Sequence, residues 1–203
     1  MKQKFLLAVL SVCMFTISTK AQINKGSTWL GGNISYNQTK TDNENDPDNK
    51  TQSLSIAPAI GKAVSDNLIV GVRLNYLYNK TTISGSSSDE RQYGGSIFVR
   101  RYLPVISRLY VFGEGSVGAN HYRGTGSKGG GFVIALTPGV SVGINKKLQL
   151  ETGFNSLFST YYMKRKTTNA TDNYTLESFG AGFNLENQST FYLGFRFLIN
   201  NKA

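Results

Sequence analysis

The chain has 203 residues, a formal charge of +10, a single cysteine and a single histidine. That composition excludes a disulfide framework and the thiolate or multi-histidine ligand sets of zinc and haem sites, so we expect neither a metal nor a cofactor. The length is that of one domain. The basic residues are scattered rather than clustered, which favours contact with anionic lipid headgroups over binding of nucleic acid.

The start of the chain has the pattern of an export signal. Lys2 and Lys4 precede an apolar run at 5–17, and small residues follow it. The run is shorter than the roughly 20 residues that a membrane-spanning helix needs, which favours a cleaved signal over a retained anchor. We therefore predict a signal peptide at 1–21 and a single domain at 22–203. The only cysteine is lost with the signal, and the loss of three lysines leaves a charge of +7.

The rest of the chain alternates between apolar and small or polar residues, which is the period of a β-strand. Eight strands are predicted in chain order, at 27–41, 51–62, 68–82, 90–103, 108–122, 131–144, 147–163 and 176–199. Their connections are alternately long and polar (42–50, 84–89, 123–130, 164–174) and short (64–67, 104–107, 145–146).

The apolar parity runs unbroken from Phe179 to Ile199, so we interpret 176–199 as one long strand rather than a hairpin at 186–189. Pro58 and Pro138 lie within strands although proline cannot donate to a ladder, so we expect a bulge at each.

An even number of strands with alternately long and short connections predicts an all-β fold, an eight-stranded antiparallel up-and-down transmembrane β-barrel of the bacterial outer membrane. The competing fold is a soluble exported barrel of the lipocalin kind, with its apolar face inside. The polar face here is mostly Gly, Ala, Ser and Asn, which suits a narrow lumen better than a water-exposed surface. The apolar face would then meet lipid, with an aromatic girdle at Tyr36, Tyr76, Tyr78, Tyr93, Tyr162 and Phe197.

Five charged residues share the parity of the small residues and are expected inside the lumen, in the half near the short turns: Arg73, Arg100, Glu114, Glu151 and Arg196. Buried charges must pair, so we predict a network in which the arginines hold the two carboxylates. Such a network could be a structural plug or a gate in a narrow pore, and the plug is favoured because an eight-stranded interior is too narrow for bulk water.

The hairpins that begin at Pro58, Arg100 and Pro138 resemble the small outer-membrane barrels related to the OmpA and OmpX transmembrane domains. The resemblance is specific for the fold and nearly silent on activity, and it implies insertion by the barrel-insertion machinery. We expect a monomer. The stretch 194–199 is similar to the aromatic assembly signal of that family, although four residues follow it.

The expected role is structural, adhesive or binding through the loops, with outer-membrane lipids and lipopolysaccharide as partners. A narrow gated pore is the alternative. A remote alternative is a lipid A-modifying hydrolase, because His121 is predicted near the outer end of its strand. No serine lies beside that histidine in the sequence, so we expect no enzyme.

Overall fold

The computed structural model describes residues 23–43, 46–83, 85–154, 157–168, 173–183 and 191–199. The predicted signal peptide lies outside them. The ten strands are β1 (Thr28–Asn43), β2 (Asp46–Ser65), β3 (Leu68–Ile83), β4 (Ser86–Ile106), β5 (Leu109–Gly124), β6 (Ser127–Gly143), β7 (Leu148–Phe154), β8 (Phe158–Thr168), β9 (Asn173–Phe183) and β10 (Phe191–Ile199).

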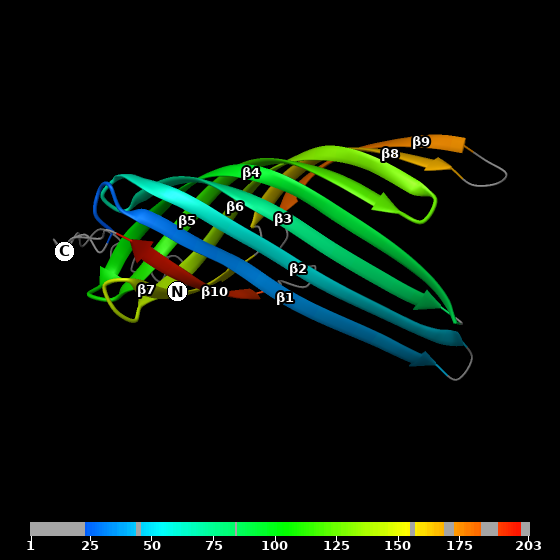
Figure 1. The fold of residues 1–203 in the computed structure, drawn as a ribbon, viewed down its shortest axis with the longest axis horizontal. Coiled ribbons are helices and arrows are strands. Elements are labelled where there is room, and N and C mark those ends of the chain that lie inside the picture. The colour runs from blue at the N-terminus through cyan, green and yellow to red at the C-terminus, as the bar shows by residue number, and fades with distance from the viewer. Residues whose placement is uncertain are drawn as a thin grey trace, which may run out of the picture.

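The strands form one antiparallel ring (Figure 1). Strands β1 to β6 pair in chain order, β6 then pairs with β7 and β8, and β10 closes the ring between β7 and β1. Eight positions result, because β7 and β8 share the seventh and β10 and β9 the eighth. We call the end with the turns at 66–67 and 107–108 the terminal end, since Ile199 lies there, and the opposite end the distal end. The predicted eight-stranded up-and-down barrel is confirmed.

The long polar connections are largely strand, which the sequence analysis did not predict. The ladder of β1 and β2 continues to the pair Asn43 and Asp46, inside the expected loop 42–50. The same happens at the next two distal connections, where the ladder of β3 and β4 continues to the pair Ile83 and Ser86, and that of β5 and β6 to the pair Gly124 and Ser127. Ladder bonds join backbone groups, so polar side chains do not end a strand that has a partner beside it.

The predicted single strand at 176–199 is wrong. It is divided into β9, which pairs with β8, and β10, which pairs with β7 and β1. The alternative hairpin at 186–189 lies outside the described residues. Parity shows which face of the sheet a side chain occupies. One long strand and two successive strands in phase have the same parity, so parity could not reveal the division.

The seventh strand is also divided, and Pro138 of β6 lies at the division. Leu136, two residues before Pro138, pairs with β8, whereas Gly139, directly after it, pairs with β7. The registers of these two ladders along β6 differ by two residues. Proline has no N–H to donate, so the ladder loses a bond where the partner changes. The bulge predicted at Pro58 is wrong, because the register of β2 with β3 is the same on both sides of it.

Among the described residues, the ring is closed over only part of its height. Strand β1 pairs with β10 from Thr28 to Asn33, and from Ile34 onward its pairs in the described residues are with β2 alone. Likewise β9 pairs with β8 alone in the part of the chain that is described. The outer parts of β1 and β9 diverge toward the distal end in Figure 1. We call the gap between these two edges the seam.

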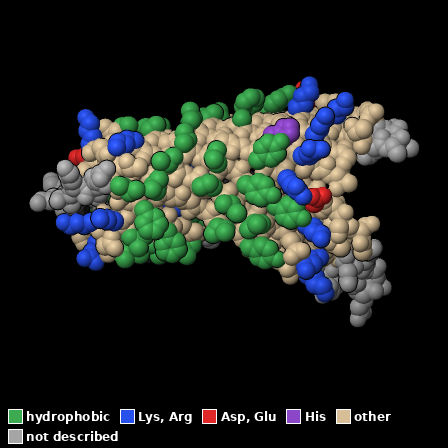
Figure 2. Space-filling view, in the orientation of Figure 1, with side chains coloured by type: hydrophobic (Ala, Val, Ile, Leu, Met, Phe, Trp, Pro, Cys, Tyr) green, Lys and Arg blue, Asp and Glu red, His purple; other side chains and the backbone are tan. Residues whose placement is uncertain are grey.

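The apolar face of the ring points outward. Leu74, Phe132 and Phe179 are 64% exposed or more, and Figure 2 shows hydrophobic side chains as a broad band between groups of Lys and Arg at the two ends. Trp29, Phe98, Tyr102, Tyr110 and Phe112 lie inside and are buried. The lipocalin-like alternative, with its apolar face inward, is therefore wrong. The described residues contain no helix long and apolar enough to cross a bilayer.

Candidate functional site

The lumen of the terminal half contains the five charged residues that the sequence analysis placed there. They come from five strands: Arg73 from β3, Arg100 from β4, Glu114 from β5, Glu151 from β7 and Arg196 from β10. Arg100 and Glu114 are direct cross-strand partners, and the structure brings all five into one connected cluster. We call this cluster the charge network.

Glu114 is held by two arginines. Arg73 Nη1 lies 2.8 Å from Oε1 and its Nη2 donates to Oε2 at 2.9 Å. Arg100 donates to Oε2 from Nε at 2.9 Å, and its Nη2 lies 2.7 Å from the same oxygen. Both oxygens of this carboxylate therefore accept charge-assisted bonds, the strongest class of hydrogen bond in proteins.

Glu151 is held from the other side of the same guanidinium. Arg100 Nη1 donates to Oε2 at 2.6 Å, and Arg196 Nε lies 2.8 Å from that oxygen. The Tyr102 hydroxyl donates to Oε1. Arg196 also donates to the Gly32 carbonyl and to Asn33 Oδ1, each at 2.7 Å, which ties the network to β1. The three arginines and two glutamates leave one net positive charge.

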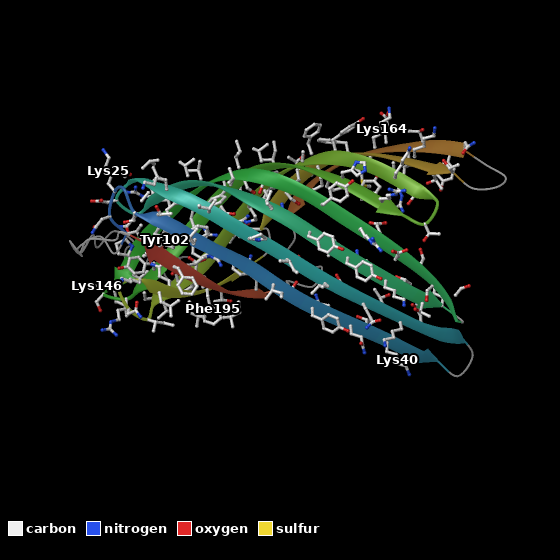
Figure 3. All side chains as sticks on the ribbon, viewed as in Figure 1. Lys25, Lys40, Tyr102, Lys146, Lys164 and Phe195 are labelled. Carbon is white, nitrogen blue, oxygen red and sulfur yellow. The ribbon has the colours of Figure 1, made fainter. Side chains whose placement is uncertain are left out.

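Aromatic rings fill the space around the network. The Arg100 guanidinium lies 4.3 Å from the Phe112 ring centroid and 4.9 Å from that of Trp29, and Arg196 lies 5.2 Å from Trp29. Trp29 Nε1 donates to the Tyr102 hydroxyl at 3.1 Å. Figure 3 shows Tyr102 within the ring. These contacts satisfy the indole N–H and add cation–π attraction to the ion pairs.

The first described residues cover the terminal end of the lumen. Ile23 is fully buried, and its carbonyl accepts a hydrogen bond from the Asn67 backbone N–H at 2.9 Å. Lys25 N–H donates to Asp66 Oδ1 at 2.8 Å, and Tyr102 N–H donates to the Asn67 carbonyl at 2.8 Å. The segment before β1 is thus fixed to the turn between β2 and β3.

Three polar side chains near the network are buried without a hydrogen-bond partner among the described residues. They are Gln149, with both amide atoms, Ser141 with its hydroxyl and Tyr192 with its hydroxyl. A buried polar group without a partner costs free energy, so these positions weaken the interior rather than strengthen it.

The distal half of the lumen is hollow. A cavity of about 390 Å³ is lined by small polar side chains of β1, β2 and β3, including Asn33, Ser35 and Ser55. Its lining also includes Arg73, Arg100 and Glu114, so the cavity ends at the charge network. A second lumenal ion pair lies nearer the distal end, where Arg165 Nη2 is 3.2 Å from Glu90 Oε2.

The six aromatic residues predicted to form a girdle all belong to the outward-facing rows. Tyr36, Tyr76, Tyr93, Tyr162 and Phe197 are exposed, and Tyr78 is half-buried. Phe197 lies toward the terminal end, because it pairs with Leu30 and Leu148. Tyr36, Tyr76, Tyr78 and Tyr93 lie in the distal halves of their strands, and Tyr162 pairs with Phe132 in the distal half of β6.

His121 lies on the outward face and stacks against Tyr93, with 5.1 Å between ring centroids. Its cross-strand partners are Tyr93 and Gly130, so the ladder brings no serine beside it. The residues described hold no group of three or more His, Cys, Asp or Glu side chains placed to bind a metal ion.

Sequence reasoning did not assign Trp29, Tyr102, Tyr110 or Tyr192 to the lumen, although all four are buried. The signal was available for Tyr102, which is two residues from Arg100 on the same strand and so shares its face. Aromatic residues were associated with the lipid-facing girdle, and that association concealed their second use as lumen filling.

No protein-family model and no curated protein matched the sequence. Among solved structures, the outer membrane protein OprG from Pseudomonas aeruginosa aligns with a TM-score of 0.53 at 10% identity, covering 89% of this chain and 99% of that one. Neisserial surface protein A aligns with a TM-score of 0.46 at 12% identity, covering 85% and 97%. The likeness to OprG shows that the two chains share the small-barrel fold.

Proposed function

We propose that this protein is a monomeric outer-membrane barrel, similar to the small OmpA and OmpX domains, whose role is structural or interactive and not catalytic. Its partners would be outer-membrane lipids, lipopolysaccharide and, during assembly, the barrel-insertion machinery. Residues 1–21 would be the export signal. The observation that carries the proposal is an outward apolar face around a lumen filled, in one half, by a network of paired charges.

The outward face supports a lipid environment. Side chains such as Ile97 and Leu136 are more than half exposed, and similar residues continue along every strand of the ring. In water so large a continuous apolar surface would drive association, since monomeric soluble proteins rarely expose apolar patches above a few hundred Å². A bilayer removes that cost, and closed ladders satisfy the backbone groups that hydrocarbon cannot.

The filled half of the lumen supports a plug. Arg100, Glu114 and Glu151 are each at most 2% exposed, and the Trp29 and Phe112 rings occupy the space beside them. Opening a path would mean separating buried ion pairs, and breaking such a pair by removing one partner typically costs about 3–5 kcal/mol. The structure therefore favours a closed barrel that stabilises the envelope or presents its distal hairpins.

A narrow pore is the second candidate, and the distal cavity is the observation that favours it. The cavity lies on the path through the ring and ends at Arg73, Arg100 and Glu114. Movement of these side chains would lengthen the open path. Lipid A hydrolysis has no comparable support, and release of fatty acid from lipid A by the purified protein would be needed to revive it.

Two measurements test the proposal. Membrane fractionation together with heat-modifiable migration in detergent gels should place the protein in the outer membrane as a folded barrel, whereas a chain soluble without detergent would refute it. In planar bilayers the purified protein should show no steady conductance. If the wild type conducts, and replacing Arg100 or Glu114 with alanine changes that conductance, the pore is correct instead of the plug.

A further inference from the structure

The outward face of the barrel carries an unusual row of cations at the distal end. Arg91, Arg123, Lys128 and Lys166 lie directly opposite one another on four neighbouring strands, β4, β5, β6 and β8. All four are exposed. Like charges placed directly across a ladder repel one another, so this arrangement weakens the sheet unless an anion lies against it.

Acidic residues neutralise the ends of this region and leave its centre free. Asp89 Oδ2 lies 3.5 Å from Arg91 Nη2, and Glu177 Oε1 lies 2.6 Å from the neighbouring Lys164 Nζ. Among the described residues, no ion pair or hydrogen bond joins the side chains of Arg123, Lys128 and Lys166 to another group. These three, which we call the cation triad, lie on adjacent strands about 4.8 Å apart, within about 10 Å of one another along the ladder.

The triad also surrounds a hollow. An open pocket of about 180 Å³ is lined by the cation triad together with Ser127 and Thr168 and the turn glycines between β5 and β6. An arginine, two lysines and the exposed hydroxyl of Thr168 are donor types that recognise a phosphate group, whereas the Ser127 hydroxyl faces the lumen, where it accepts a hydrogen bond from Arg165.

An apolar groove lies below the triad on the same face of β5. The outward residues Gly113 and Gly115 leave β5 recessed between the larger side chains of β4 and β6, and Val117, Ala119 and His121 follow on the same face before Arg123. A groove of about 240 Å³ is centred there and lined by residues such as Val99 and Leu136. A Cβ built on Gly115, the glycine that lines this groove, would meet only Leu136 Cδ2, at 3.7 Å, which is ordinary van der Waals contact.

The spacing between the triad and the groove fits one leaflet of a bilayer. Gly115 is eight residues from Arg123, about 26 Å along the strand, or about 20 Å in depth at the usual tilt of barrel strands. Half of a hydrocarbon core about 30 Å thick is about 15 Å, with headgroups beyond it. A ligand with phosphate at the triad would therefore place its acyl chains along the groove.

We propose that the cation triad and the β5 groove together form a binding site for one phosphorylated, acylated lipid of the outer leaflet, with the chemistry of lipid A. The phosphate lies between Arg123, Lys128 and Lys166, and an acyl chain lies along the recess at Ala119 and Gly115. The inference rests on the proposed location in the outer membrane and names one defined site within it.

The test measures binding of fluorescent bisphosphorylated lipid A to the purified barrel in detergent, at fixed ionic strength. The triad variant Arg123→Gln, Lys128→Gln, Lys166→Gln is compared with a matched variant, Lys40→Gln, Lys50→Gln, Lys80→Gln, which removes the same charge from the distal ends of β1, β2 and β3. The triad variant should bind at least about tenfold more weakly than the matched variant. Equal weakening of both variants would show diffuse attraction and overturn the site.

Two further arms identify the ligand. Gly115→Leu fills the groove and should weaken lipid A binding while leaving heat-modifiable migration unchanged, and unaltered binding would overturn the acyl part of the site. Dephosphorylated lipid A should bind at least about tenfold more weakly, and inorganic phosphate at millimolar concentration should not compete. Full competition by inorganic phosphate would mean a free-anion site and refute the lipid. If the wild type fails to enter the membrane fraction at all, the proposed function fails first; failure of the triad arm alone leaves it standing.

Discussion

Arg100 of β4 and Glu151 of β7 are 51 residues apart in the chain, yet Arg100 Nη1 lies 2.6 Å from Glu151 Oε2 inside the lumen. Their side chains are at most 1% exposed. The pair spans the lumen rather than following one ladder, so it braces non-adjacent walls of the ring.

Removing the charge at this brace should destabilise the barrel. Glu151→Gln leaves Arg100 and Arg196 with one carboxylate fewer in a buried site, so the free energy of unfolding should fall by about 3 kcal/mol. Urea unfolding in lipid vesicles measures this through Trp29, the only tryptophan of the chain, which lies against both arginines. Glu177→Gln, in the exposed pair with Lys164, is the control and should leave the midpoint unchanged. Equal effects of the two substitutions would contradict a buried network.

Removing an unsatisfied amide should have the opposite effect. Gln149 is fully buried, and neither of its amide atoms has a partner among the described residues. Gln149→Leu keeps most of the side-chain volume and removes the two unpartnered amide atoms, so the free energy of unfolding should rise by about 1 kcal/mol in the same assay. Gln52→Leu, which removes exposed hydrogen bonds to Tyr36 and Gln38, should give no gain. A loss of stability in Gln149→Leu would reveal a hydrogen-bond partner for that amide.

Two glycines with opposite surroundings allow a matched test of lumen packing. A Cβ on Gly71 would clash with the Ile60 carbonyl oxygen and lie 2.8 Å from Phe98 Cε1, whereas a Cβ on Gly113 meets nothing within 4 Å. Gly71→Ala should therefore cost about 2 kcal/mol through overpacking, and Gly113→Ala should cost little. Urea unfolding compares the two variants, and equal costs would contradict the close packing of Ile60 and Phe98 around Gly71.

The seam should be visible by hydrogen exchange. Between Thr28 and Asn33, strand β1 is paired on both sides, whereas from Ile34 onward its described pairs are on one side alone. Amides that point into the seam have no ladder partner in the part of the chain that the structure describes, so a fraction of those at 34–40 should exchange at least about tenfold faster than those at 28–33. Uniform protection along β1 in lipid vesicles would show that another segment covers this edge.

The sequence predicted which face of the barrel a side chain occupies better than it predicted where each strand begins and ends. Parity was enough to place Arg73, Glu114 and the other network residues inside, because a strand has two faces and a one-residue shift would expose every one of them. It was enough also to turn Ile97 and Leu136 outward. These inferences depend on local period, which a single sequence contains.

Where a strand ends depends on which strand lies beside it, and the local sequence does not contain that information. The stretch 42–50 has a typical loop composition, yet part of it is strand because β1 and β2 lie beside each other there. The division between β7 and β8 arises opposite Pro138, on a different strand. The cover that Ile23 makes over the terminal end depends on Asn67, which no spacing rule connects to it.

The pairing of Thr28 with Ile199 has a consequence for how the ring forms. The neighbouring strands β1 to β6 pair through short connections and can assemble as a growing sheet, but the last ladder joins opposite ends of the polypeptide and carries the largest loop-closure entropy. The hydrogen bonds between Ile23 and Asn67 hold the beginning of β1 against its early neighbours. Closure then becomes the docking of β10 onto an edge that is already anchored, the step at which a folding catalyst in the membrane would act most effectively.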